Sequence, residues 1–257
     1  MNNIVIQGIL FDEKSSFQKG PALAPPLIRK ALHSGSANYF TEDGTHIDFS
    51  EITDAGDFSI SEYFGIEKIT ARQLQTHNKV FTLGGDHSIT FPILRALQKK
   101  HPIIDVLHID AHADLYAEFE GDPYSHACPF ARIMEHKLAV RLVQVGIRTL
   151  NTHQREQIET YEVEVHEMKT LDISSIQPFS NPVYISLDMD AFDPAYAPGV
   201  SHHEPGGLSS RQVLDLIQGI TTEVIGADIV EYNPSRDFQD MTAYLAAKMM
   251  KEILGKM

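Results

Sequence analysis

The sequence predicts an α/β fold in which about eight strands form one mostly parallel sheet with helices on both faces. Short apolar runs of the kind that form buried strands alternate with helical segments from residue 80 onward. Strands that alternate with helices in this way imply right-handed βαβ crossovers. No internal repeat, low-complexity tract or linker divides the 257 residues, and we therefore expect a single domain over 1–257.

The N-terminal third is expected to have fewer regular elements than the rest. Prolines at 25 and 26 favour the first turn of a helix, whereas residues 33–62 are polar and irregular. The elements predicted here are a strand at 4–10, a loop at 12–26 that leads into a helix ending near 32, a short strand near 51–53 and a helix at 67–78.

From residue 80 the pattern is regular. The apolar run at 80–83 is stopped by two glycines, and the later strand candidates are also short apolar runs. The predicted strands lie at 80–83, 103–109, 140–145, 163–165, 183–187 and 224–230. The predicted helices lie at 89–100, 125–136, 151–160, 209–220 and 240–255.

The composition argues against several classes of protein. Thirty-five acidic and 21 basic residues give a formal charge of -14, which disfavours nucleic acid and anionic membranes as partners. No apolar run approaches the roughly 20 residues of a membrane span, and the N-terminal segment lacks a signal-peptide pattern. The one cysteine, Cys128, excludes an internal disulfide, and we interpret it as a small buried thiol because no base is dedicated to it. We expect a reducing, cytoplasmic location.

The segment 105–114, which reads DVLHIDAHAD, is the one around which the rest of the chain is organised. Its apolar run ends in an Asp-x-His-x-Asp triplet. If the run continues as a strand, side chains alternate between faces, and Asp110, His112 and Asp114 point the same way. Three metal-capable groups at a strand end indicate a metal site, and a hydrogen-bonded network of the same groups is the alternative.

Three other predicted strands also run into polar motifs. These motifs are GGDHS at 84–88, SLDMDAFDP at 186–194 and DIVEYNP at 228–234. Ligands bind beyond the carboxyl ends of the strands in open parallel sheets, and carboxylates packed together repel one another unless a cation joins them. The candidate ligands of two divalent ions are therefore His87, Asp110, His112, Asp114, Asp188 and Asp190.

The types of these ligands favour Mn²⁺, because they mix oxygen and nitrogen and include no thiolate. Six ligands cannot fill two octahedral sites unless some bridge, and we expect Asp110 and Asp188 to be shared. Two ions about 3.5 Å apart would make a bridging water ionise near neutral pH. Glu231 could pair with a guanidinium, and His126, in the YSHACP segment at 124–129, could shuttle a proton. For Glu231 the alternative is a strand-end carboxylate that pairs with Lys or Arg.

Together, these motifs resemble those of the ureohydrolases, the family of arginase, agmatinase, formimidoylglutamase and related guanidino hydrolases. The resemblance covers roughly residues 80 to 235 and, more loosely, the stretch at 20–29. It implies a three-layer α/β/α sandwich with an eight-stranded sheet, two Mn²⁺ ions per subunit and a homo-oligomer, either a trimer or a hexamer. It also implies that a metal-bridging hydroxide attacks a guanidino carbon and that urea departs.

The resemblance also implies a role for each motif residue. One ion would be held by His87, Asp110, Asp114 and Asp188, and the other by Asp110, His112, Asp188 and Asp190. His126 corresponds to the family's proton-shuttling histidine and Glu231 to its guanidinium-binding glutamate. Asp193 stands where the family keeps a further aspartate, which we place behind the metal ligands.

The choice of substrate depends on the loops around this site. Arginases carry an Asn shortly after the triplet and a Ser-Gly-Asn segment before the shuttle histidine, whereas this chain has Tyr116 and the segment DPYS at 122–125. These departures look agmatinase-like. The acidic residues Glu118, Glu120 and Asp122 would suit a cationic amine tail, although exposed acids of a loop are the commoner explanation. His202 and His203 stand where many agmatinases have Thr-Pro. They could contact the substrate tail or an extra metal ion, although packing of the loop is the favoured interpretation. His202 is the candidate substrate contact of the two, as is Tyr116.

We therefore predict a hydrolase of a small cationic guanidino compound, with agmatine converted to putrescine and urea by preference. Another ureohydrolase activity is the first alternative, on a guanidino acid, arginine or formimidoylglutamate. A binuclear phosphoesterase is a second, although the acidic loops do not suit a phosphate. The third is a non-catalytic metal-binding relative, which should have lost ligands that this chain retains.

Overall fold

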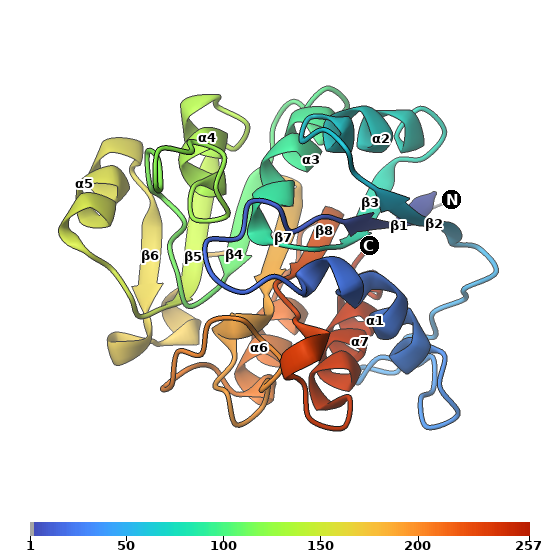
Figure 1. Cartoon of the computed structure of the whole chain (residues 1–257). Helices are drawn as coiled ribbons and strands as arrows, with labels where there is room; N and C mark the ends of the chain where they lie inside the picture. Colours follow the sequence, from blue (N-terminus) through green and yellow to red (C-terminus); the bar gives the residue numbers. More distant parts are fainter. Residues whose placement is uncertain (1–2) are drawn as a thin grey trace.

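The computed structural model describes residues 3–257 and contains eight parallel strands in one sheet, which confirms the predicted fold class (Figure 1). Across the sheet the strands follow the order β2-β1-β3-β8-β7-β4-β5-β6. The N-terminal segment, in which the sequence shows no signal-peptide pattern, includes residues 1–2, and these two residues lie outside the part of the chain that the structure describes. The strands are β1 (Ile4–Leu10), β2 (Thr53–Ser59), β3 (Lys79–Leu83), β4 (Asp105–Ile109), β5 (Arg141–Ile147), β6 (Glu164–Glu167), β7 (Val183–Asp188) and β8 (Val224–Val230).

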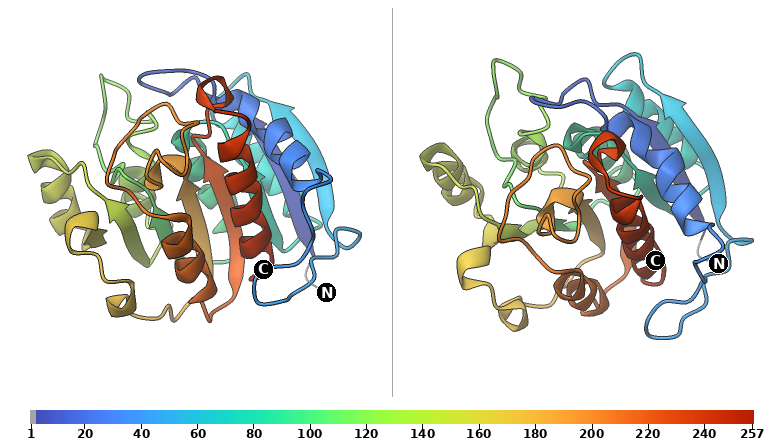
Figure 2. Two further views of the ribbon diagram at one scale, coloured as in Figure 1. Left: turned by 90° about the horizontal axis from the view of Figure 1, so that it is seen from below. Right: turned by 60° about the horizontal axis from the view of Figure 1, so that its bottom comes forward.

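Helices cover both faces of the sheet and make three layers (Figures 1 and 2). One face is covered by α1 (Ala24–Leu32), α6 (Ser210–Gln218) and α7 (Met241–Leu254). The other is covered by α2 (Gly65–Gln73), α3 (Thr90–Leu97), α4 (Pro129–Glu135) and α5 (Thr152–Tyr161). Within residues 3–257, none of the helices combines the length and the apolar character needed to cross a membrane.

The central strands are buried along their whole length, whereas the edge strands are not. Every residue of β3, β4, β7 and β8 is buried, as expected of a parallel sheet with helices on both faces. The edge strand β2 is polar and mostly exposed, which explains why its sequence predicted only a short strand near 51–53. Its observed range is later and longer.

Helix α4 begins four residues later than predicted. Pro129 is its first residue, a position that suits proline because the missing N–H would have no intrahelical partner. The segment with Ser125 and His126 therefore belongs to the loop before the helix, where side chains can turn toward the sheet edge. Helix α2 also ends earlier than predicted, at Gln73 instead of near 78.

The register of the central strands brings their carboxyl ends to one level. Ile109 of β4 pairs with Leu187 of β7, Leu187 pairs with Ile229 of β8, and Ile229 pairs with Leu83 of β3. Because the four strands are neighbours and parallel, the residues that follow them meet at one edge of the sheet.

Candidate active site

A cavity of about 200 Å³ lies at this edge. Of the ten site residues predicted from sequence, the eight that line it are His112, Asp114, Tyr116, His126, Asp188, Asp190, His202 and Glu231. The remaining two, His87 and Asp110, are fully buried beside Asp114 and Asp188. The structure thus gathers all ten around one cavity.

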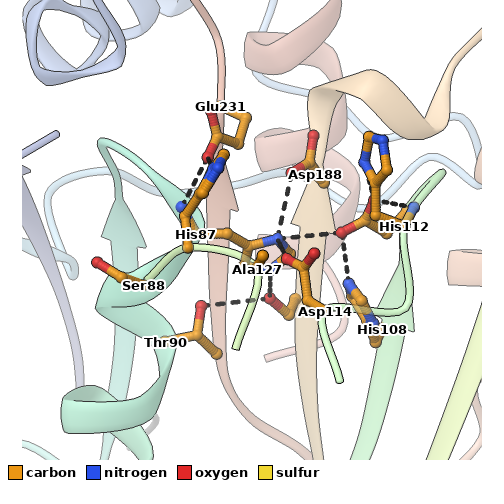
Figure 3. Close-up of polar contacts among 12 residues, drawn as sticks. His87, Ser88, Thr90, His108, His112, Asp114, Ala127, Asp188 and Glu231 are labelled. Atoms are coloured by element: carbon orange, nitrogen blue, oxygen red, sulfur yellow. Dashed lines mark hydrogen bonds and ion pairs between the residues drawn. The ribbon is translucent and has the colours of Figure 1, made fainter. Parts of the chain in front are cut away.

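His87 is placed by the turn after β3, which requires glycine. A Cβ atom on Gly85 would lie 1.6 Å from the carbonyl oxygen of Phe11, so no other residue fits this close approach. The imidazole that follows is fully buried. Its Nδ1 lies 3.1 to 3.2 Å from one carboxylate oxygen each of Asp110, Asp114 and Asp188 (Figure 3).

The other ring nitrogen of His87 is held by a chain of hydrogen bonds. Nε2 lies 2.9 Å from the Ser186 hydroxyl, which donates to the carboxylate of Asp228 at 2.7 Å. Asp228 also accepts hydroxyl protons from Thr90 and Tyr184. Because the Ser186 proton is used on Asp228, its oxygen accepts from Nε2–H. In the neutral ring, the Nδ1 lone pair then faces three carboxylates and has no hydrogen-bond partner.

The electrostatics of this cluster favour added positive charge. Burial and the charges of Asp190 and Asp110 raise the pKa of Asp188 well above its ordinary value. Burial lowers the pKa of His87, but hydrogen bonding to Asp110 and the other carboxylates outweighs it and raises this pKa well above the usual range. Both shifts have the direction expected where buried carboxylates crowd together, an arrangement that favours a positive charge among them. An unpartnered imidazole nitrogen among carboxylates is a donor set that fits a divalent metal ion.

A second group of potential ligands adjoins the first and shares Asp110 with it. His112 Nδ1 lies 3.1 Å from Asp190 and 3.4 Å from Oδ1 of Asp110, whereas Oδ2 of Asp110 faces His87. Two sets of three side chains have donor atoms close enough to hold an ion, namely His87, His108 and Asp110, and Asp110, His112 and Asp190. Asp110 is common to both, which is the position expected of a shared ligand.

The backbone turns as soon as the strand is over. Strand β4 ends at Ile109, as predicted, so the triplet lies in the loop after it, and its side chains do not alternate between faces as they would if the strand continued. The chain bends after Asp110, and Asp114 has a left-handed φ of 49°. Asp110 and Asp114 consequently face His87, and His112 turns toward Asp190.

Glu231 and His126 form a buried pair that also lines the cavity. His126 Nδ1 lies 2.8 Å from Glu231 Oε1, an oxygen that also accepts the backbone N–H of His87 at 2.9 Å. Burial lowers the pKa of His126, but the charge of Glu231 and its hydrogen bond to the ring, together with the charges of Asp86 and Asp114, outweigh burial and raise this pKa to about 9. Oε2 of Glu231 is buried without a partner. Glu231 lines the cavity, and this free oxygen is available to an N–H donor of a ligand.

The predicted substrate contacts lie on the outer wall of the cavity. Tyr116 accepts a hydrogen bond from Asn151 at 2.7 Å, and the His202 ring lies 5.5 Å from that of His126. His203, in contrast, turns away and bonds to the carbonyl of Pro198. Of the two loop histidines, only His202 lines the cavity among the described residues.

Two acidic residues that were assigned from sequence occupy structural positions. Asp193 accepts the backbone N–H groups of Gly206 and Gly207 and thereby holds the loop that carries His202. Asp122, in the acidic stretch 118–122, forms an ion pair with Lys14 at 2.6 Å. Within residues 3–257, no residue of 118–122 other than Phe119 lines the cavity.

Several residues at the site were missed from sequence. Behind the cluster, His108 donates from Nε2 to Oδ2 of Asp110 at 2.7 Å. Its Nδ1 accepts from Gln144, which also donates to a backbone carbonyl and so fixes the tautomer. His108 alternates with Asp110 along the chain and could have been noticed. Ser16 and Glu204 also line the cavity, but they come from loops without a recognisable pattern.

Known proteins match this chain along nearly its whole length. The arginase family matches residues 2–255. The chain is 46% identical to the mitochondrial arginase of Medicago truncatula over 97% of this chain and 80% of that protein. It is 30% identical to an agmatinase of Bacillus cereus over 98% of this chain and 91% of that protein. The solved structure of arginase from Medicago truncatula has a TM-score of 0.91 at 41% identity, covering 99% of this chain and 87% of that one.

Proposed function

The chain belongs to the arginase family, and from this premise we propose that it hydrolyses the guanidino group of L-arginine to L-ornithine and urea. The observation that supports this reaction is the unpartnered Oε2 of Glu231 in the cavity that also contains the histidine and aspartate cluster. A guanidinium needs a carboxylate to hold it and an activated water to attack it. The cavity has groups for both.

We propose two manganese ions per subunit as the cofactor. The residues that would hold them are His87, Asp110, His112, Asp114, Asp188 and Asp190. When bound, such ions supply Lewis acidity that lowers the pKa of water toward 7. Nitrogen and carboxylate ligands without thiolates suit manganese, and the four carboxylates balance the charge of two divalent ions.

Glu231 and His126 bind the substrate and handle its protons. Glu231 accepts an N–H of the guanidinium at Oε2 and places its carbon toward the cluster. As water adds to this carbon, the C–N bond to the amine breaks, and His126 delivers a proton to the leaving nitrogen. The products are urea and a primary amine, and the proton returns to His126 from the added water.

L-Arginine is our first substrate because the sequence is more similar to the arginase than to the agmatinase. Agmatine, which the loop sequences favoured, is the second candidate. One observation supports it: among the described residues, no lysine or arginine side chain lines the cavity to receive an α-carboxylate. Glu204 at the rim would accept the ammonium group that both compounds can carry.

Urea release from L-arginine, agmatine and guanidinobutyrate by the manganese-loaded protein tests the proposal. We expect the highest kcat/KM with L-arginine. A higher value with agmatine would overturn the choice of substrate but not the reaction, and no urea from any of them would overturn both. Metal analysis tests manganese, and light scattering tests the trimer or hexamer, which stays a prediction.

A further inference from the structure

The loop between β1 and α1 reaches the proton-handling side of the cavity. The backbone N–H of Lys14 donates to Asp86 at 2.9 Å, and the carbonyl of Lys14 accepts from the backbone of His126 at 3.2 Å. Further along, the carbonyl of Gln18 accepts from the hydroxyl of Ser201 at 2.9 Å. The loop is therefore fixed on both sides of Ser16, which lines the cavity.

Ser16 makes two contacts with the same nitrogen of His126. Its hydroxyl lies 2.8 Å from Nε2, and its backbone N–H donates to Nε2 at 3.1 Å. The other ring nitrogen, Nδ1, lies 2.8 Å from Glu231. Both nitrogens of the imidazole consequently have protein partners, one on each side.

The two contacts from Ser16 respond differently to the protonation state of the ring. A backbone N–H can only donate, and it bonds to Nε2 only while Nε2 carries no proton. A hydroxyl donates to the neutral ring and accepts from the protonated one. A histidine that gives and regains a proton passes through both states, and the hydroxyl of Ser16 is the contact that survives in each.

We propose that Ser16 is a positioning residue for proton transfer by His126, and that its hydroxyl keeps the imidazole aligned in both protonation states. This role rests on the proposed function, in which His126 protonates the leaving amine. It assigns to an N-terminal loop a part in the reaction, although Ser16 and His126 are separated by 110 residues in sequence.

Other titratable groups also face His126 and must stay constant in a test. Glu231 approaches from the end of β8, Asp86 from the turn after β3 and Asp114 from the loop after β4. The ring of His202 lies 5.5 Å away on the outer wall. A pair of variants that differ only in the hydroxyl at position 16 leaves these four groups unchanged.

The test compares Ser16→Thr with Ser16→Val, which have the same shape, and uses Ser15→Ala as a neighbouring control. The hydroxyl of Ser15 is buried without a partner, so its removal should leave kcat unchanged. We expect Ser16→Thr to retain most activity. In Ser16→Val we expect kcat to fall about tenfold, part of the 10² to 10⁴ that general acid–base catalysis contributes, with KM nearly unchanged.

The pH dependence gives a second readout. In Ser16→Val only the amide donor remains, and it favours the neutral ring, so His126 should lose its proton at lower pH. The alkaline limb of the kcat profile should therefore move to lower pH by about one unit relative to Ser16→Thr. Equal kcat values and equal profiles in the Thr and Val variants would overturn the proposal.

A measurement without turnover separates this proposal from the proposed function. Histidine NMR of the magnesium-loaded protein, with the His126 signal assigned from His126→Asn, gives the pKa of His126 in both variants. A lower pKa of His126 in Ser16→Val than in Ser16→Thr supports the positioning role, even if the wild-type protein releases no urea. The absence of urea would contradict only the proposed reaction. An equal pKa overturns the positioning role even if urea is released.

Discussion

The buried cluster and the rim of the cavity are built in different ways. The cluster lies at the carboxyl ends of β3, β7 and β4 and consists of His87, Asp110, His112, Asp114, Asp188 and Asp190. The rim consists of loop residues, among them Ser16, Tyr116, His202 and Glu204. Most of the cluster is buried and held by further hydrogen bonds, whereas the rim is largely half-exposed. The reaction class follows from the cluster, and the choice of substrate follows from the rim.

This difference has a physical origin. Neighbouring parallel strands in fixed register leave little freedom to the residues at their ends, and buried polar groups must be satisfied. The hydrogen bonds that link His87 to Ser186 and Ser186 to Asp228 fix the position of the His87 ring and also satisfy these buried polar groups. Loops on the surface have fewer such demands and can change with less loss of stability.

The largest effect is expected in the cluster, for Asp110→Asn. The change removes a charge from the side chain that faces both His87 and His112, and we expect loss of bound manganese and at least a thousandfold loss of kcat. Asp105→Asn is the matched control, because Asp105 is buried at the opposite end of the same strand. Metal content per subunit and urea release are measured together, and full activity in a metal-depleted variant would contradict the proposed chemistry.

A smaller effect is expected where the cluster meets the substrate, for Glu231→Gln. The amide still accepts from the backbone of His87, but it no longer offers a charge to the guanidinium. We expect kcat/KM to fall by about 10² to 10³, with manganese retained. Glu204→Gln is the matched change on the rim and should lower kcat/KM less than tenfold. Similar losses in both variants would erase the distinction between cluster and rim.

Behind the cluster, His108→Phe should weaken metal binding without removing a ligand. Phenylalanine keeps the stacking on Phe130, whose ring centroid lies 3.7 Å away, but cannot donate to Asp110. We expect the manganese Kd to rise about 10- to 100-fold, the usual cost of losing a hydrogen bond to a ligand. Calorimetric titration with manganese measures it, with His101→Phe as control. An unchanged Kd would limit His108 to a packing role.

The sequence predicted the fold and the composition of the cluster because both depend on repeated local patterns. Apolar runs located seven of the strands, whereas the polar β2 was predicted only at its first residue. The polar motifs directly after the central strands located the residues that gather around the cavity. The backbone path was less predictable. Asp114 and Glu231 both have positive φ values, 49° and 61°, so the backbone turns at both residues. Such turns depend on neighbouring segments that no local pattern reveals.

The rim was predicted poorly for a related reason. Ser16 reaches His126 only because a loop far away in sequence is fixed by Asp86 and Ser201. The charge of the acidic stretch 118–122 suggested a contact with a cationic substrate tail, yet Asp122 forms an ion pair with Lys14. Charge and residue type alone do not show which loop side chains turn inward.

The smallest effect is expected on the rim itself, for His202→Thr. The His202 ring lies beside those of His126 and Phe17 and lines the cavity, but it makes no hydrogen bond among the described residues. Loss of the His202 ring should change the shape of the outer wall of the cavity. We expect the ratio of kcat/KM for L-arginine to kcat/KM for agmatine to change by about tenfold at most, which is the scale of a modest change in pocket shape. His203→Thr is the matched control, because His203 turns away from the cavity. Manganese content should be unchanged in both variants. A loss of metal, or a hundredfold loss of kcat on both substrates, would place His202 with the cluster and show that this part of the rim takes part in the chemistry.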